Sequence, residues 1–346
     1  MSSNENKSLY FTIMQILLTG CAGFIGSASV AEFISKGFSV VGLDNLNDYY
    51  NVDLKKTRLR KLIDKREFSF FECDISKRGH IEKILKDFKF DAAIHLAAQA
   101  GVRIGYNFNY KYTESNIDGF INMVNYCVNN DISNFIYASS SSVYGKNSSK
   151  EFNETNEHLN PTSYYGLTKM MNELIAKHYS ILQGIKCRGL RFFTVYGPFG
   201  RPDMAYFRII DSLINGKPFK LLGDGHAKRD FTFIDDVSTV ISALTLDLIQ
   251  KDTSFYDVVN VGGGNPYSIN DVIFELENLF KKKLIILRDV TNPLDVPYTC
   301  ASSKYLEDLI GFKPSIDLKT GLRMVYDWVS EDNMKSKISN WASSSI

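Results

Sequence analysis

The sequence predicts an α/β protein with a doubly wound parallel sheet, followed by a smaller mixed α/β lobe in the C-terminal part. Three observations support this fold class: apolar runs alternate with segments long enough for crossover helices, a glycine-rich turn follows the first run, and the alternation loosens after about Gly197. The chain has 346 residues, which is enough for one large or two modest domains.

The expected elements begin with a strand, a turn, a helix and a second strand, at residues 14–19, 20–26, 27–36 and 39–44. Gly37 ends the helix because glycine is favoured just beyond a helix C-terminus. Four later apolar runs are the next expected strands, at residues 68–73, 92–97, 134–139 and 186–193. This order predicts a βαβ unit that continues into a parallel sheet with helices on both faces.

The C-terminal part is marked by glycine and proline, as in Gly197-Pro198 and Gly216-Lys217-Pro218. We therefore expect residues 1–13 to be an N-terminal extension, residues 14–196 to form the sheet domain, and residues 197–346 to form mainly the smaller lobe. Asp257 to Val261 is an apolar run that can return to the main sheet, so the boundary need not be a clean cut.

Composition excludes several classes of function. The formal net charge is +1, with no dense run of Lys and Arg, so no nucleic-acid partner is expected. No apolar stretch is long enough for a membrane span, so no membrane partner is expected. The five cysteines are scattered, without a metal-like grouping with histidines, which predicts reduced thiols in a cytoplasmic protein and no metal site.

The turn Gly20-Cys21-Ala22-Gly23-Phe24-Ile25-Gly26 is typical of a Rossmann-type dinucleotide site. Three glycines at this spacing let the backbone approach a pyrophosphate, which the amides at the helix N-terminus then hold. Asp44 ends the next strand, where a carboxylate accepts hydrogen bonds from a ribose and repels a 2′-phosphate, so NAD is favoured over NADP. The other residues expected at this site are Asn45, Asp74, Ile75, Leu96, Ala97, Ala98, Asn116 and Ser139.

Tyr165 and Lys169 are the candidate proton-transfer pair. They stand four residues apart, so on a helix they share one face, and the Lys169 ammonium can favour the Tyr165 phenolate. Lowering a phenol pKa of about 10 by roughly three units requires about 4 kcal/mol of electrostatic stabilisation of the phenolate. We expect Lys169 and a cationic nicotinamide ring to supply it. The alternative is a chance Tyr-x-x-x-Lys pattern on an amphipathic helix. His95, in the apolar run 92–98, is interpreted as a packed core residue.

These motifs resemble the extended short-chain dehydrogenase/reductase family, specifically its nucleotide-sugar 4-epimerases, and most of all the UDP-glucuronate 4-epimerases. The resemblance covers residues 14 to about 330 and includes the stretches 43–50, 97–103, 190–198, 200–205, 228–232 and 295–297. It is most specific in residues 45–50, 99–103 and 192–204. It implies that Tyr165 takes the proton of the sugar 4-hydroxyl, that Lys169 holds the nicotinamide ribose, and that Ser140 hydrogen-bonds the reacting oxygen. It also implies that NAD accepts the C4 hydride and that the hydride returns after the 4-keto sugar has turned over.

The resemblance also implies the substrate contacts. Arg201 and Arg229 are expected at the diphosphate, Asp295 at the uridine part, and Gln99 and Arg103 elsewhere in the substrate site. Leu294 and Ser302 depart from the family pattern, in which a glycine and an aspartate stand at these positions.

The serine run 139–142 favours an epimerase over the related dehydratases and decarboxylases. Related 4,6-dehydratases carry an Asp–Glu pair after the catalytic hydroxyl residue, and UDP-glucuronate decarboxylases carry a glutamate, whereas Ser141 and Ser142 stand here. With Ser140 and Thr194, these hydroxyls can hold a C6 carboxylate. Because the 4-keto intermediate is a β-keto acid, holding its carboxylate out of alignment with the ketone would prevent loss of carbon dioxide.

Other functions remain open from the sequence. They are 4-epimerisation of UDP-glucose or of a 2-acetamido uronate, UDP-glucuronate decarboxylation, and NAD binding without catalysis. Thr299 lies near the position that sets room for the sugar 2-substituent in related epimerases, and it does not decide among them. The family also implies a homodimer through the helices that follow Ser115 and Thr162. Four aliphatic residues suit that contact or ordinary core packing, namely Ile121, Val124, Leu174 and Ile175.

Overall fold

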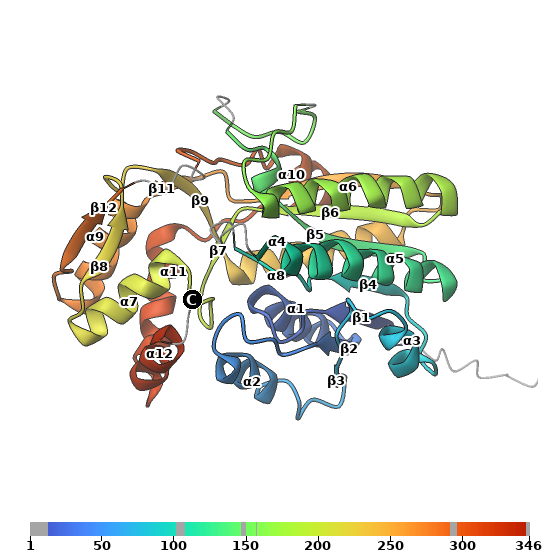
Figure 1. Cartoon of the computed structure of the whole chain (residues 1–346), viewed down its shortest axis with the longest axis horizontal. Helices are drawn as coiled ribbons and strands as arrows, with labels where there is room; N and C mark the ends of the chain where they lie inside the picture. Colours follow the sequence, from blue (N-terminus) through green and yellow to red (C-terminus); the bar gives the residue numbers. More distant parts are fainter. Residues whose placement is uncertain (1–12, 102–107, 147–149, 157, 291–295, 344–346) are drawn as a thin grey trace, which may run out of the picture.

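The structure is a computed structural model that describes residues 13–101, 108–146, 150–156, 158–290 and 296–343. Its main body is a seven-stranded parallel sheet in the order β10-β6-β5-β4-β1-β2-β3 (Figure 1). The strands are β1 Gln15–Thr19, β2 Ser39–Asp44, β3 Phe68–Glu72, β4 Ala92–His95, β5 Asn134–Ser140, β6 Lys186–Phe192 and β10 Tyr256–Val261. The doubly wound α/β fold is therefore confirmed, and residues 1–12 of the expected N-terminal extension lie outside the described residues.

Helices cover both faces of this sheet. One face carries α3 His80–Leu85, α5 Gly119–Asn129 and α6 Tyr164–Gln183, and the other carries α1 Phe24–Ser35, α8 Ile234–Ile249 and α10 Lys304–Ile310. Shorter pieces connect them: α2 Val52–Arg60, α4 Asn109–Tyr112, the π-helix η2 Thr113–Asp118 and the 3₁₀ turn η3 Ser141–Val143. No helix in the described ranges is long and apolar enough to cross a membrane.

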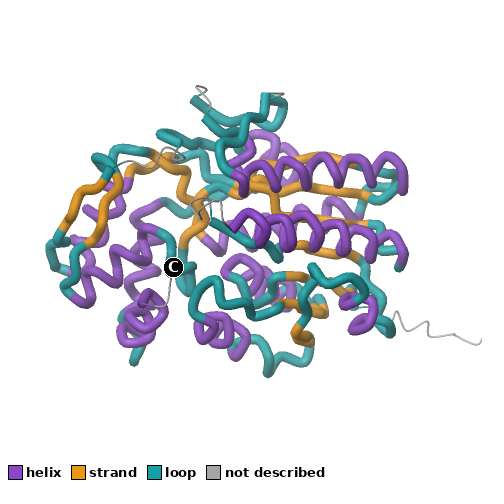
Figure 2. The backbone as a smooth tube through the Cα atoms, in the orientation of Figure 1, coloured by secondary structure: helices purple, strands orange, loops and turns teal. Residues whose placement is uncertain are grey.

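In the described residues, the smaller lobe contains two small sheets and four helices that lie beside them. One small sheet has the order β11-β9-β7, with one antiparallel and one parallel pairing, and the other pairs β12 with β8. Its strands are β7 Thr194–Tyr196, β8 Phe219–Leu222, β9 Lys228–Phe233, β11 Pro266–Ser268 and β12 Ile286–Asp289. Its helices, drawn in purple beside the orange strands in Figure 2, are α7 Ala205–Asn215, α9 Ile269–Phe280, α11 Leu318–Val329 and α12 Met334–Ser343.

The chain crosses between the two parts more than once. It leaves the large sheet after Phe192, since Thr194–Tyr196 already pairs with β9. It then returns through α8 and β10, and β10 pairs with β6 along its length. The return that the sequence left open for Asp257 to Val261 is thus present, and the large sheet uses segments from both sides of residue 196.

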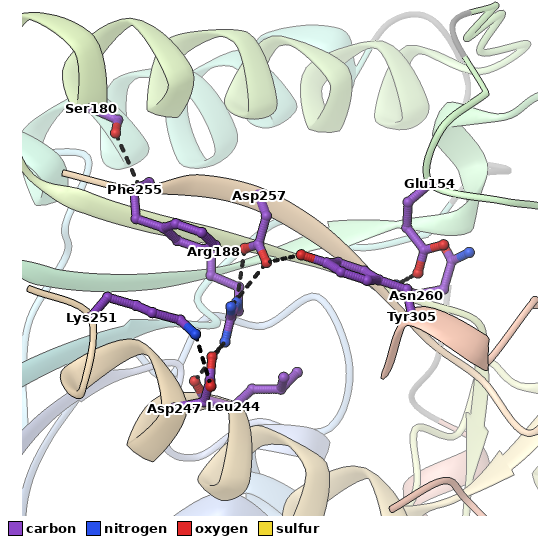
Figure 3. A network of polar contacts seen from close by, with 10 residues as sticks. All are labelled: Glu154, Ser180, Arg188, Leu244, Asp247, Lys251, Phe255, Asp257, Asn260 and Tyr305. Atoms are coloured by element: carbon purple, nitrogen blue, oxygen red, sulfur yellow. Dashed lines mark hydrogen bonds and ion pairs between the residues drawn. The ribbon is translucent and has the colours of Figure 1, made fainter. Parts of the chain in front are cut away.

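A buried arginine fixes this returning segment (Figure 3). Arg188 on β6 donates to both carboxylate oxygens of Asp257 on β10, at 2.8 and 2.9 Å, and to Asp247 on α8 at 2.7 Å. Tyr305 on α10 donates to Asp257 at 2.9 Å. Because the guanidinium is fully buried, removing a carboxylate would leave its charge uncompensated. This network therefore joins one sheet edge to two helices.

Candidate active site

Two adjoining cavities lie at the carboxyl ends of the large sheet's strands. The smaller has a volume of about 250 Å³ and borders the glycine turn, and the larger has about 870 Å³ and extends into the smaller lobe. Both are lined by Ser140 and Tyr165, which are candidate catalytic residues, and by Tyr49 and Arg201. The two cavities therefore meet where the sequence predicts the chemistry.

The smaller cavity is built around the glycine turn. Gly20 has φ +75°, and a Cβ added there would lie 2.7 Å from the Ala97 nitrogen. A Cβ on Gly26 would lie 2.0 Å from the Gly20 carbonyl oxygen. Only glycine fits at these two positions, so the backbone stays open at the start of α1, as a pyrophosphate cradle requires. The other expected cofactor residues that line it are Phe24, Ile25, Asp44, Asn45, Asp74, Ile75, Leu96, Ala97, Ala98, Ser139, Tyr165 and Lys169, with Gly23 in the turn.

Asp44 is placed as a ribose-binding carboxylate would be. It ends β2 and lines the smaller cavity, and its two oxygens accept from the backbone nitrogens of Ala22 at 3.2 Å and Leu46 at 2.8 Å. A carboxylate has about four lone-pair sites, so these two bonds orient Asp44 and leave acceptors for ribose hydroxyls.

Asn116 is an expected cofactor residue whose side chain binds neighbouring segments of the protein. It is buried, lines neither cavity, and exchanges hydrogen bonds with the backbone of Gln99 at 2.8 and 3.1 Å. Its amide also donates to the Thr168 hydroxyl at 3.0 Å. Asn116 thus joins the segment after β4 to α6, and its effect on the cavities is exerted through Gln99, which lines both.

Local sequence places the catalytic candidates on two elements. Ser163 caps α6, because its hydroxyl accepts from the Gly166 nitrogen at 3.1 Å, so Tyr165 lies in the first turn and Lys169 in the next. Ser140 is the last residue of β5, and it lines both cavities together with Tyr165. The Lys169 ammonium lies 5.9 Å from the centre of the Tyr165 ring. The structure therefore brings all three predicted catalytic residues together.

The electrostatics differ from the expectation in one respect. Burial raises the pKa of Tyr165, while the charge of Arg201 and the hydrogen bond from Ser140 lower it. Burial also lowers the pKa of Lys169 to about 7, and its ammonium donates to the Ala138 carbonyl at 2.8 Å. The expected lowering by Lys169 is thus wrong for the chain's own groups, because desolvation outweighs the nearby charges. Of the two causes expected to lower the pKa of Tyr165, the cationic nicotinamide ring remains.

Arg201 stands at the junction of the cavities and is already paired. Its Nε and Nη2 donate to the two carboxylate oxygens of Asp203, at 3.0 and 2.5 Å, which fixes the plane of the guanidinium. Tyr49 lies beside this pair, and burial together with Asp203 raises the pKa of Tyr49 to about 12. Sequence reasoning did not select Tyr49 or Asp203, although both fall within the stretches 43–50 and 200–205 that it singled out.

Four hydroxyl side chains line the larger cavity from two sheets. Ser140 ends β5, Ser141 and Ser142 form the 3₁₀ turn that follows, and Thr194 begins β7 of the small sheet. The backbone nitrogen of Ser142 donates to the Ser140 hydroxyl at 3.1 Å, which holds the turn against the strand end. The hydroxyl cluster expected from the sequence therefore faces one cavity, beside Tyr165.

The far end of the larger cavity is formed by the smaller lobe. Arg229 on β9 lines it, together with the strand Phe219–Leu222 and Thr299. Arg229 lies far enough along the cavity that it does not border the smaller one. The remaining expected substrate residues, Arg103 and Asp295, lie outside the described residues.

A buried carboxylate supports this end of the cavity. Asp230 accepts from the backbone nitrogens of Gly263 at 3.0 Å and of Gly264 and Ala301 at 2.9 Å each. Its own backbone nitrogen donates to the Thr299 hydroxyl at 3.3 Å. Asp230 is fully buried, so these bonds replace the water its carboxylate has lost. The consequence is a fixed position for Thr299.

Comparison with protein-family descriptions matches residues 16–262 to the NAD dependent epimerase/dehydratase family. The chain belongs to this family. Curated relatives include the UDP-glucuronate 4-epimerase of Thermodesulfobacterium geofontis (strain OPF15), 39% identical over 91% of this chain and 96% of the relative. Another is UDP-glucuronate 4-epimerase 4 of Arabidopsis thaliana, 39% identical over 90% of this chain and 74% of the relative.

A solved structure is similar over nearly the whole chain. It is UDP-glucuronic acid 4-epimerase from Bacillus cereus in complex with UDP-glucuronic acid and NAD, with a TM-score of 0.84 and 34% identity over 92% of this chain and 99% of that one. The resemblance to NAD-dependent nucleotide-sugar epimerases, and the matching α/β fold, are therefore confirmed.

In this member of the epimerase/dehydratase family, an unpredicted pair supports the catalytic helix. Glu173 lies one turn beyond Lys169 on α6 and binds Arg191 on β6 through two bonds, at 2.8 and 2.7 Å. Ser139, next to Ser140, donates to Glu173 at 2.5 Å. Both members of the pair are buried. The register of α6 on β5 and β6 is therefore fixed one turn from the reacting groups.

The structure also shows the surroundings of His95 and of the cysteines. His95 is buried and bonds Thr19 at 2.8 Å, and burial lowers its pKa to about 3, so it is a neutral core residue as interpreted. The five cysteines are all free and buried. No group of three or more His, Cys, Asp and Glu within the described ranges could hold a metal ion.

Proposed function

We propose that this chain is a UDP-glucuronate 4-epimerase, which interconverts UDP-glucuronate and UDP-galacturonate with tightly bound NAD. The observation that carries the proposal is the position of Ser140 and Tyr165 between a dinucleotide cradle and a cavity lined by further hydroxyls. The named activity of the relatives, and the UDP-glucuronic acid and NAD held by the Bacillus cereus enzyme, support it.

The residues that would hold NAD are the glycine turn at the pyrophosphate, Asp44 at the adenosine ribose and Lys169 at the nicotinamide end. NAD bound there supplies a hydride acceptor for C4 of the sugar. Tyr165 takes the proton of the 4-hydroxyl, and Ser140 hydrogen-bonds the same oxygen. When the keto sugar has turned over in the larger cavity, the hydride would return to the opposite face of C4 and Tyr165 would return the proton, so the complete cycle changes no oxidation state.

Hydroxyl groups favour the epimerase over two related reactions. A 4,6-dehydratase needs an acid and a base beside the catalytic serine, and a decarboxylase of this family carries a glutamate, but Ser141 and Ser142 occupy those positions. These serines and Thr194 would hold the C6 carboxylate by neutral hydrogen bonds. An intermediate whose carboxylate is fixed away from the ketone's π system would keep its carbon dioxide.

Replacing Ser142 by alanine is expected to increase carbon dioxide release from UDP-glucuronate or to raise the KM for it. Losing one hydrogen bond to a charged group corresponds to about 1.5–3 kcal/mol, or roughly ten- to a hundredfold in binding. The matched measurement uses UDP-glucose, which has no carboxylate and whose binding we expect to change little. If both carbon dioxide release and uronate affinity stay as in the wild type, Ser142 does not hold the carboxylate.

We also propose that the enzyme is a homodimer in which α6 packs on α6 of a second copy. Six apolar side chains on this helix are exposed at near-helical spacing: Tyr164, Leu167, Met171, Leu174, Ile181 and Leu182. Leu174 and Ile181 are 61% and 70% exposed. Val124, offered as a contact from the sequence, is fully buried in the core, so the proposed interface depends on α6.

The double variant Leu174→Glu/Ile181→Glu is expected to be monomeric, because it would bury four carboxylates in a symmetric interface. Its mass would be measured by sedimentation or by light scattering after gel filtration. Phe274→Glu is the matched control, because Phe274 is 60% exposed on α9 in the other lobe. A double variant with the wild-type mass would contradict the proposed interface.

The test of the function is proton NMR of the purified protein with UDP-glucuronate, without added NAD, with carbon dioxide recorded in parallel. UDP-galacturonate without carbon dioxide is the expected result, and it would also show that NAD is retained. A pentose product would indicate a decarboxylase instead. If nothing turns over even with NAD supplied, UDP-glucose and 2-acetamido uronates are the next substrates. A cytoplasmic location stays a prediction.

A further inference from the structure

Arg58 on α2 is a buried arginine that the proposed chemistry does not use. It is 2% exposed, and all of its donor nitrogens are occupied. Nε donates to the Phe199 carbonyl at 3.0 Å, and Nη2 donates to the same carbonyl at 2.7 Å and to that of Gly200 at 3.3 Å. Nη1 donates to the Ala22 carbonyl at 3.0 Å and to the Tyr50 hydroxyl at 2.6 Å. These contacts use the five N–H groups of a guanidinium.

The partners of Arg58 belong to two functional segments. Ala22 lies inside the glycine turn that forms the dinucleotide cradle. Phe199 and Gly200 directly precede Arg201, which lies at the junction of the two cavities. One side chain therefore binds the cofactor turn, 36 residues before it in sequence, and the loop 197–201, whose Phe199 is 141 residues after it.

The loop has a backbone that needs such support. Phe199 has φ +59°, in the left-handed region that a bulky residue rarely adopts. Arg58 donates two hydrogen bonds to the Phe199 carbonyl. The Phe199 ring centre lies 4.9 Å from that of Trp328 and 3.9 Å from the Lys61 ammonium. A strained conformation persists only where its surroundings fix it. Arg58 thus supplies two of the bonds that set the course of the chain into Arg201.

The charge of Arg58 lacks a carboxylate partner among the contacts found in the described part of the chain. Its partners are three carbonyls and a hydroxyl, whereas the buried Arg188 and Arg191 each bind at least one carboxylate. A buried cation is costly unless an anion compensates it. The dinucleotide pyrophosphate, which the proposed function places at the turn containing Ala22, is the anion that this charge would face.

We propose that Arg58 is a positioning residue that couples NAD binding to the substrate loop. The anion at the glycine turn stabilises the guanidinium in the position where it binds Ala22, and the same guanidinium orders the loop that carries Arg201. NAD and the UDP part of the substrate should then strengthen each other's binding, although the residues that bind them come from different parts of the chain. This inference rests on the proposed function for the identity of the two ligands.

The experiment measures that coupling on the full-length protein after its NAD has been removed. Equilibrium dialysis gives the NAD dissociation constant with and without saturating UDP, which binds without reacting. In the wild type, UDP is expected to tighten NAD binding by about fivefold or more, a common size for coupling between sites. In Arg58→Lys the factor should fall to about one, since one ammonium cannot bind the turn and the loop together.

Two further variants separate coupling from folding. Arg188→Lys is the matched control: Arg188 is equally buried but lies in the network of Figure 3, so the melting temperature should fall while the coupling factor stays at the wild-type value. Tyr50→Phe removes a single partner of Arg58 and should lower the factor partly, and it carries the test if Arg58→Lys does not fold.

An Arg58→Lys or Tyr50→Phe protein with the wild-type factor would overturn the proposal, as would a wild type in which UDP leaves NAD binding unchanged. These readouts need no turnover. A wild type that couples NAD to UDP but leaves UDP-glucuronate unchanged would therefore refute the proposed reaction and not the role of Arg58.

Discussion

Tyr165→Phe is expected to lower kcat by about a thousandfold while the fold and the bound NAD remain. The variant removes the only atom proposed to carry the 4-hydroxyl proton, and a positioned acid–base group contributes about 10²–10⁴-fold to rate. The ring stays, so its packing against Tyr112, with centroids 6.1 Å apart, is preserved. Epimerisation would be followed by NMR, and retained NAD by its absorbance after the protein is denatured.

The neighbouring tyrosine provides the control. Tyr164 lies in the same turn of α6, is 37% exposed, and bonds Thr113 through its hydroxyl at 2.8 Å. Tyr164→Phe should keep nearly the wild-type kcat. Substantial epimerase activity in Tyr165→Phe, or equal losses in both variants, would show that Tyr165 is not the proton carrier.

Lys169→Met is expected to remove most of the activity and to stabilise the protein freed of NAD. Burial lowers the pKa of Lys169 to about 7 in the folded state, against 10.5 for an ordinary lysine. Between these values the unfolded chain holds a proton that the folded chain lacks, so this group makes stability rise with pH over that window. Each pH unit is worth about 1.4 kcal/mol, or about 3 kcal/mol from pH 7 to pH 9.

The measurement is the melting temperature of wild type and Lys169→Met at pH values from about 6 to about 9, together with kcat. This range begins below the lowered pKa of Lys169 and extends into the window where stability should rise. The wild type should gain stability with pH and the variant should gain less, while at pH 7 the variant should melt higher. Lys177→Met, on the exposed side of the same helix, should leave both quantities unchanged. Parallel pH profiles for wild type and Lys169→Met would contradict the cost assigned to the buried amine.

Local sequence was enough to find the residues that act through local geometry. The glycine turn and the Tyr165–Lys169 pair are set by spacing within one turn or one helix, and Ser140 is set by the end of a strand. Asp44 could be placed because a strand end in a βαβ unit has a known position at the crevice. These residues all line the cavities where they were expected.

What the sequence could not provide depends on contacts between distant segments. Arg58 meets Phe199 across 141 residues, and Asp230 meets Ala301 across 71 residues, so neither role has a local signature. The contacts of Asn116 with Gln99 and Thr168 likewise join separate segments of the chain, and its expected cofactor contact stays a prediction. The direction of the Tyr165 pKa also required the burial of the site, because charge alone predicts a lowering.

The return of α8 and β10 to the large sheet limits how such enzymes can exchange parts. A chimera joined at residue 196 would take its sugar-binding lobe from another epimerase, but it would also take the edge strand β10. Arg188 of the first parent would then face foreign residues in place of Asp247 and Asp257. A chimera that keeps this sheet intact must take Arg188, Asp247 and Asp257 from the same parent. Substrate specificity in this fold therefore cannot be transferred by exchanging one continuous segment of sequence.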